Sequence, residues 1–228
     1  MIVCPLQSFG LGDIIFSQSL IKNIIDKNDK ICWSVYPDLV EGLNRAYPDV
    51  AFVPDNLLNI DFNQKIDTIT NNIRIIPIRW ADNILQLTLD DCMKSKYMLY
   101  NLDYKMWMQH ANYVRDSKRE ESLYDKVVGG YKSYRLVNET FNTTLDGKRA
   151  IPLSTELPIV QLKKVEGYSL FDWSLVIERA AEVHTVSTSL FYLLELLNLH
   201  QPLHLYPRPN DPKFQHINYL FTKSYILH

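Results

Sequence analysis

Two short segments, one near each end of the chain, place small or hydroxyl-bearing residues where an apolar run gives way to a helical pattern. The first reads SFGLGD and the second VSTSLF. Their candidate ligand-binding residues are Gly10, Gly12, Asp13, Ser187, Thr188 and Ser189. Glycine lets a ligand approach the main chain closely, and a helix N-terminus offers N–H groups with partial positive charge. Both segments are therefore candidate phosphate-binding turns.

Asp13 adds a carboxylate at the start of the first expected helix. A carboxylate here could act as a general base, taking a proton from a substrate hydroxyl within hydrogen-bond reach. The alternative is that Asp13 is the N-cap of its helix and nothing more. The segment is not a GxGxxG motif, because position 15 is Ile. A tight structural turn is therefore the alternative for Gly10 and Gly12.

The hydroxyls of the second turn could hold a diphosphate and stabilise the negative charge that develops on a leaving nucleotide. A plain Ser/Thr helix cap is the alternative. Cationic side chains near expected turns could assist: Arg79 in the first half, and Lys148, Arg149 and Arg208 in the second. Each of them could equally be an ordinary surface charge.

The sequence predicts no metal site and no cofactor. Cys4, Cys32 and Cys92 are widely spaced, with no CxxC motif or Cys/His cluster. We interpret them as reduced core thiols. His184 lies inside an expected strand, where a core histidine is favoured over a catalytic one. The motifs GxSxG, HExxH and GxxxxGK are absent, which removes the usual support for hydrolases, zinc proteases and P-loop NTPases.

Composition indicates a globular protein. The chain has 228 residues, enough for one large or two small domains, and 46% of them are hydrophobic. A formal net charge of -2 gives no global positive field to hold a polyanion. No basic segment precedes a long apolar run, and no run approaches the roughly 20 residues that span a bilayer. We therefore expect a cytoplasmic protein without membrane insertion.

Apolar runs alternate with helical patterns, which is typical of a parallel sheet covered by helices. Strands are expected at residues 2–6, 30–36, 50–53, 73–78, 134–137, 157–162, 183–186 and 203–206. Helices are expected from residue 13, over 39–47, from residue 169 with a capping box, and over 190–197. Each half therefore reads as a Rossmann-type layer.

An aromatic stripe and a charged run separate the two halves. The stripe steps by three and four, which predicts one helix face within residues 92–114; its members are Met93, Tyr97, Tyr100, Tyr104 and Trp107. It would form core or interdomain packing, or line an acceptor groove. The charged run at 115–126 indicates a boundary. We place the boundary there, which divides the chain into an N-terminal domain at 1–114 and a C-terminal domain at 115–228.

Two segments resemble the ADP-heptose type of lipopolysaccharide heptosyltransferase and its relatives among GT-B glycosyltransferases. They are IVCPLQSFGLGDIIFSQSLIKNI and GYSLFDWSLVIERAAEVHTVSTSLFYLLELL. The family opens with a strand, a small-residue turn ending in Gly-Asp, and a helix. It later has a helix, a strand and an Asp-Ser/Thr-Gly turn that opens another helix. Here Ser187 stands in place of Asp and Ser189 in place of Gly.

The resemblance implies a compact GT-B-like α/β fold, in which two Rossmann-like halves with parallel sheets face a cleft and the second half is truncated. It makes 1–114 the N-terminal acceptor-side domain and 115–228 the C-terminal nucleotide-sugar-binding domain. It also implies a hexosyl-, pentosyl- or heptosyltransferase. Such an enzyme would move a sugar from a nucleotide diphosphate sugar to an acceptor hydroxyl, with inversion and without a metal. The acceptor would be a glycan, a small molecule or a modified nucleic acid. By position, Asp13 matches the catalytic base, Gly12 the acceptor-side turn, and Thr188 with Ser189 the phosphate-contacting turn.

Two other functions are kept open. One is a nucleotide or nucleotide-sugar binding protein of the same fold without transfer activity. The other is an interaction module built on the aromatic stripe, which would bind no nucleotide.

Overall fold

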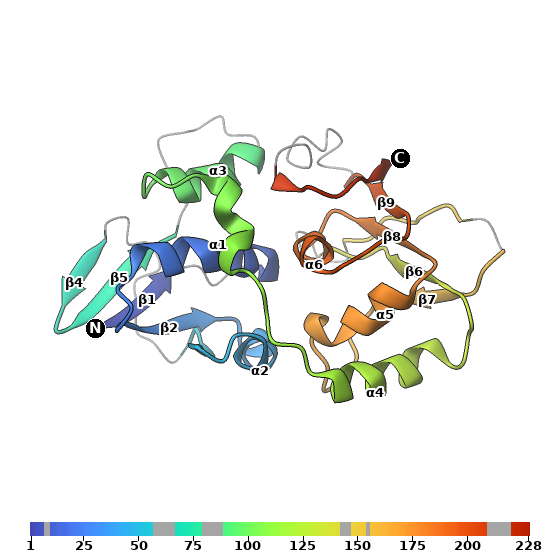
Figure 1. Ribbon diagram of the computed structural model, residues 1–228, viewed down its shortest axis with the longest axis horizontal. Helices are drawn as coiled ribbons and strands as arrows, with labels where there is room; N and C mark the ends of the chain where they lie inside the picture. Colours follow the sequence, from blue (N-terminus) through green and yellow to red (C-terminus); the bar gives the residue numbers. More distant parts are fainter. Residues whose placement is uncertain (7–9, 57–66, 79–88, 142–146, 154–155, 209–219) are drawn as a thin grey trace. The chain divides into compact units, whose positions relative to one another are not determined.

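The computed structural model describes the chain except for residues 7–9, 57–66, 79–88, 142–146, 154–155 and 209–219 (Figure 1). Of the candidate site residues, Arg79 lies outside this description. The chain divides into two compact units, Met1–Val114 and Arg115–His228, and each is described by itself. Among the described helices, none is long and apolar enough to cross a membrane.

The first unit is built on a five-stranded sheet in the order β3-β2-β1-β5-β4. Its strands are β1 (Ile2–Leu6), β2 (Lys30–Val35), β3 (Val50–Pro54), β4 (Thr68–Thr70) and β5 (Ile73–Pro77). All neighbours are parallel except β4, which pairs antiparallel with β5. The four parallel strands confirm the sequence prediction. β4 was not predicted, and it joins β5 through Asn71 and Asn72.

The β4–β5 turn explains why so short an edge strand forms. Asn71 and Asn72 have φ of 50° and 64°, and Thr70 pairs directly with Ile73 across them. A two-residue loop with both φ angles positive matches the right-handed twist of a hairpin, and asparagine tolerates that conformation well.

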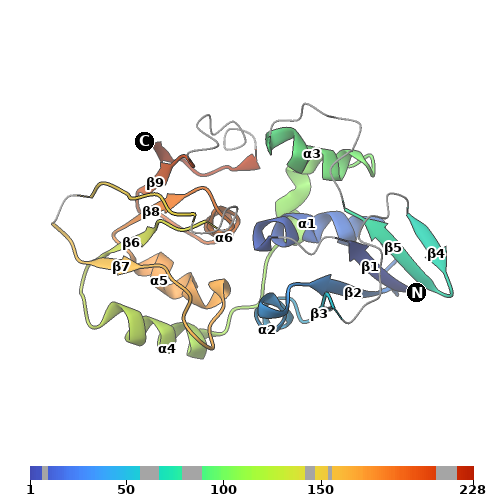
Figure 2. The same ribbon diagram turned by 180° about the vertical axis from the view of Figure 1, so that it is seen from behind.

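The helices of the first unit are α1 (Leu11–Ile24), α2 (Pro37–Ala46), α3 (Leu89–Met98) and the 3-10 helix η1 (Tyr104–His110). The sequence predicted that this helix starts at Asp13, and α1 begins two residues earlier, at Leu11. It lies between the sheet and α3 (Figures 1 and 2). Every residue from Ile14 to Ile21 is buried, as expected for a helix covered on all sides.

The aromatic stripe does not form one helix face, so that prediction is wrong. α3 ends at Met98, Asn101 takes a left-handed conformation with φ of 54°, and a separate 3-10 helix follows. The rings of Tyr97 and Trp107 instead pack around Phe16 of α1, at centroid distances of 5.0 and 5.8 Å. Both side chains are buried. These two stripe residues are therefore core, which removes the basis for an interaction module built on them.

The second unit carries a fully parallel sheet in the order β10-β9-β8-β6-β7. Its strands are β6 (Arg135–Asn138), β7 (Ile159–Gln161), β8 (Glu182–Val186), β9 (Leu203–Tyr206) and β10 (Ile226–Leu227). Four of the five were predicted. β10 was not, because two exposed residues at a sheet edge leave no apolar run to detect.

The helices of the second unit are α4 (Ser117–Val128), η2 (Leu170–Trp173), α5 (Ser174–Arg179) and α6 (Leu190–Leu196). α4 and α5 pack on one side of the sheet (Figures 1 and 2). The predicted capping box is confirmed: Ser169 and Asp172 exchange hydrogen bonds at the start of η2. The predicted α/β architecture of two Rossmann-like halves is thus confirmed.

Candidate functional site

Asp13 does not occupy the N-cap position of α1. Gly10 does, and Asp13 is the third helical residue. Asp13 Oδ1 forms an ion pair with Lys96 Nζ of α3. The Lys96 side chain is fully buried, whereas the Asp13 side chain is 29% exposed. A buried ammonium requires such a counter-charge, because removing one partner of a buried pair leaves the other charge uncompensated.

Position 10 requires glycine for two reasons, its backbone conformation and the closeness of the Asp13 carboxylate. Its φ is 68°, and a Cβ built on it would lie 2.7 Å from Asp13 Oδ2. Only glycine adopts this φ without strain and leaves room for the carboxylate. The two carboxylate oxygens thus have different surroundings: Oδ1 is on Lys96, and Oδ2 lies against the glycine turn. Gly12 is buried in the first turn of α1.

Sequence reasoning missed Lys96. The residue lies three positions after Met93 of the predicted stripe, so a charged residue on a buried helix face was a visible signal. Its partner is 83 residues earlier in the chain. Nothing in the spacing of either segment identifies Asp13 as that partner.

The second turn follows β8 and opens α6. Thr188 Oγ1 accepts hydrogen bonds from Leu190 N–H at 3.3 Å and from Asn138 Nδ2 at 3.2 Å. The Thr188 hydroxyl therefore supports the start of α6 from the residue before the N-cap, and α6 has no side-chain cap hydrogen bond. Ser189 stands at the N-cap position without a side-chain cap hydrogen bond and is partly exposed. Ser187 is buried.

Two guanidinium groups lie beside this turn. Arg208 Nε donates to the main-chain oxygen of Ser187, and its guanidinium lies 5.3 Å from the ring centroid of Phe141. The structure thus brings Arg208 and the serine turn together, as the sequence suggested. Arg149 donates to the main-chain oxygen of Pro207 and lies over the Tyr206 ring at 5.8 Å. Both guanidinium groups therefore lie near the carboxyl ends of β8 and β9.

The candidate residues fall into two groups, one in each unit. Gly10, Gly12 and Asp13 lie at the carboxyl end of β1 in the first unit. The residues of the turn at 187–189 and Arg208 lie at the carboxyl ends of β8 and β9 in the second. Ligands of open α/β sheets bind at this edge, because strand-to-helix turns expose N–H groups there.

A further cluster was missed altogether: Glu182, His184 and His204 each offer a metal-ligand atom, and these atoms lie within 4.8 Å of one another. His184 is buried as predicted. Its Nδ1 lies 3.2 Å from the Tyr206 hydroxyl, whereas its Nε2 has an ion-pair contact of 3.5 Å with Glu182 Oε1 but no well-aligned hydrogen bond. The pattern EVHTV places Glu182 and His184 on one strand face, which was a usable signal.

Comparison with known proteins finds no matching protein-family model and no matching curated protein. Solved structures do match. A glycosyl transferase family 9 protein from Veillonella parvula covers 100% of this chain and 86% of its own, with 9% identity and a TM-score of 0.50. The chain shares the fold of this protein. The resemblance read from the two sequence segments is therefore confirmed at the level of the fold.

Two structures of the E. coli heptosyltransferase WaaC are also similar to the chain. The structure with ADP is 12% identical, covers 93% of this chain and 89% of its own, and has a TM-score of 0.43. The structure with ADP-2-deoxy-2-fluoro heptose is 12% identical, covers 100% and 93%, and has a TM-score of 0.47. The similarity to the Veillonella protein shows the fold alone.

Proposed function

We propose that this chain is a glycosyltransferase that moves a sugar from a nucleotide diphosphate sugar to an acceptor hydroxyl, with inversion and without a metal in the reaction. The observation that carries the proposal is the pairing of Asp13 with the buried Lys96 at the first strand–turn–helix of a family 9 fold. The unit Met1–Val114 would hold the acceptor and the unit Arg115–His228 the nucleotide.

Asp13 would be the general base. Lys96 holds Oδ1, so the carboxylate has a fixed orientation, and the partial exposure of Asp13 leaves it accessible to a substrate. The acceptor hydroxyl would give its proton to the carboxylate while its oxygen attacks the anomeric carbon. The bond from that carbon to the diphosphate oxygen would break, and its electron pair would leave with the nucleoside diphosphate. One displacement of this kind inverts the anomeric centre.

The serine turn and its guanidinium groups would stabilise the leaving diphosphate. Arg149 donates its hydrogen bond to a carbonyl oxygen, which carries no net charge. Within the described part of the chain, no carboxylate forms an ion pair with Arg149. Its guanidinium lies at the carboxyl end of β9, beside the strand that leads to Ser189, and Arg208 contacts the same turn through the main-chain oxygen of Ser187. Charge that develops on the leaving group would be stabilised there more than the ground state.

The second candidate is a nucleotide-sugar binding protein of the same fold without transfer activity. The ion pair of Asp13 supports this alternative, because Lys96 already binds one carboxylate oxygen. Asp13→Asn separates the two functions. A transferase loses turnover in this variant and keeps donor binding, whereas a binding protein has no turnover to lose.

A ligand screen tests the donor side first. Thermal unfolding of the full chain would be followed with ADP, UDP, GDP, CDP and dTDP, and then with the sugar nucleotides of each base that binds. A ligand at 100 times its Kd adds about 2.7 kcal/mol of stability. If no nucleoside diphosphate raises the Tm at millimolar concentration, the proposed donor site is wrong.

A further inference from the structure

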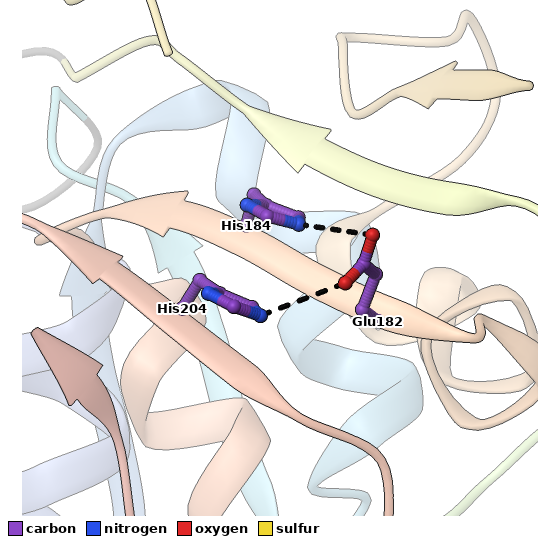
Figure 3. A group of neighbouring side chains, drawn as sticks. All are labelled: Glu182, His184 and His204. Carbon is purple, nitrogen blue, oxygen red and sulfur yellow. Dashed lines mark ion pairs between the residues drawn. The ribbon is translucent and has the colours of Figure 1, made fainter. Parts of the chain in front are cut away.

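The sheet of the second unit brings two histidines and a glutamate together on one face. His184 of β8 pairs directly with His204 of β9, and Glu182 lies two residues before His184, on the same face. Figure 3 shows both imidazole rings turned toward the Glu182 carboxylate. His184 Nε2 lies 3.5 Å from Oε1, and His204 Nε2 lies 3.6 Å from Oε2.

The other ring nitrogens of both histidines have partners. His184 Nδ1 lies 3.2 Å from the Tyr206 hydroxyl, and His204 Nδ1 lies 2.9 Å from Nε2 of His228. A histidine that binds a metal typically uses one nitrogen as the ligand, while a hydrogen bond from the other fixes the tautomer and the ring orientation. In both histidines the Nδ1 atom has such a partner, and the Nε2 atom is left to act as the metal ligand.

His184 Nε2 is a buried polar atom without a well-aligned hydrogen bond. The residue is 5% exposed, and the Glu182 carboxylate, 3.5 Å away, forms no well-aligned hydrogen bond with this nitrogen. Burial, and then repulsion from the charged form of His204, lower the pKa of His184, and burial lowers the pKa of His204, in each case against the opposing effect of the Glu182 carboxylate. The neutral imidazole is the form that binds a metal.

The distances suit a small tetrahedral ion. Zinc binds histidine nitrogen and carboxylate oxygen at about 2.0–2.2 Å, so neighbouring ligands of a tetrahedral site lie about 3.3–3.5 Å apart. His204 Nε2 lies 3.6 Å from Glu182 Oε2, close to this edge length, and the ligand atoms of all three residues lie within 4.8 Å of one another. The two imidazoles stack at a centroid distance of 4.2 Å, and small ring rotations would bring both Nε2 atoms toward one ion.

The positive charge of Arg135 would repel a metal ion bound to Glu182. This repulsion is limited because Arg135 contacts the carboxylate oxygen that would not bind the ion. Arg135 Nε donates to Glu182 Oε1, so Oε2 is the oxygen that would bind the ion. A carboxylate ligand is commonly held by a hydrogen bond to its second oxygen. Arg135 would therefore act as the outer partner of the carboxylate.

We propose that Glu182 Oε2, His184 Nε2 and His204 Nε2 bind a divalent transition metal, with Zn²⁺ as the best match. Nitrogen-rich ligand sets select zinc, cobalt, nickel or copper over magnesium and calcium, which prefer oxygen. Glu182 begins β8, whereas Ser187 follows its other end. The ion would clamp β8 to β9 and take no part in sugar transfer, so this site does not depend on the proposed function.

The test uses the full chain, treated with a chelator and then titrated with Zn²⁺, Co²⁺ and Mg²⁺. We expect calorimetry to find one Zn²⁺ per chain, a rise in Tm with Zn²⁺ and Co²⁺ but not Mg²⁺, and visible absorption typical of tetrahedral Co²⁺. His204→Asn and Glu182→Gln should weaken Zn²⁺ binding by at least about tenfold. Glu182→Gln preserves side-chain size but removes the counter-charge of Arg135, so urea unfolding of both variants without metal is measured first, at a temperature where both are folded.

His200→Asn is the matched control, because His200 is an exposed histidine of the same unit outside the cluster. It should bind Zn²⁺ like the wild type. The proposal is overturned if the wild type binds no Zn²⁺, or if the two cluster variants bind it as tightly as His200→Asn. Nucleotide binding, measured on the same samples, reports separately on the donor site.

Discussion

Lys96 and Asp13 form an ion pair that joins α3 to the first turn of α1, across 83 residues of sequence. The Lys96 side chain is fully buried, so its charge must be compensated inside the fold. The pair gives the first unit a carboxylate of fixed orientation beside a glycine turn. That combination is what a positioned base requires.

Removing the carboxylate charge should destabilise the fold. Asp13→Asn should lower the free energy of unfolding by about 3 kcal/mol, because Lys96 loses the counter-charge that Asp13 supplies. Urea unfolding measures this change. The double variant Asp13→Asn, Lys96→Met should be more stable than Asp13→Asn alone, since it removes the buried charge as well. Wild-type stability in Asp13→Asn would show that the pair contributes nothing.

Gly10 should be less tolerant of alanine than a glycine with open surroundings. Gly10→Ala combines a positive φ with a Cβ 2.7 Å from Asp13 Oδ2. Gly129 also has a positive φ, but an added Cβ meets nothing within 4 Å. Gly129→Ala should therefore cost about 1–2 kcal/mol from backbone strain alone, and Gly10→Ala should cost more. Equal losses in urea unfolding would show that the carboxylate moves aside freely.

Arg149 should contribute to diphosphate binding, and its neighbour Lys148 should not. Arg149→Met removes a charge-assisted contact, so the Kd of the best-binding nucleoside diphosphate should rise about tenfold, which is 1.4 kcal/mol. Lys148→Met is the control, because Lys148 is 62% exposed and already pairs with Glu139 at 3.3 Å. Calorimetry at constant salt measures both. A larger effect of Lys148→Met than of Arg149→Met would contradict the donor geometry.

Cys4 should make folding stability fall at high pH. Burial, and to a lesser extent the neighbouring Cys32, raises the pKa of the Cys4 thiol from 9.0 to about 11. Between these values the unfolded chain loses a proton that the folded chain keeps, so this contribution is complete below pH 9 and is lost toward pH 11. Urea unfolding from pH 8 to 11 should show a smaller decline for Cys4→Ala. Identical slopes for both proteins would contradict it.

The sequence predicts the parallel strands well, because each is a buried apolar run between turn residues. β1 and β8 illustrate this: four of five residues are buried in each. β4 and β10 escaped prediction because they are two or three residues long and mostly exposed, and neighbouring strands alone make them strands. The aromatic spacing gave a wrong helix prediction because the three- and four-residue steps continue across Asn101, where the helix is interrupted.

The candidate turns could be located from local sequence, but their partners could not. The glycine–aspartate pair at 12–13 and the serine turn at 187–189 can each be recognised from a segment of six residues. The Asp13–Lys96 pair depends on how α3 packs on α1, and the His184–His204 pairing depends on which strands are neighbours in the sheet. Such contacts are set by topology, on which short-range spacing carries no information.

The most direct test is turnover of the best-binding sugar nucleotide by wild type and Asp13→Asn, with a panel of hydroxyl acceptors, at a temperature where both are folded. Release of nucleoside diphosphate and the donor Kd would be measured on the same samples. The wild type should transfer sugar, and Asp13→Asn should be slower by at least about 100-fold with an unchanged donor Kd. Wild-type turnover in Asp13→Asn would show that Asp13 is not the base.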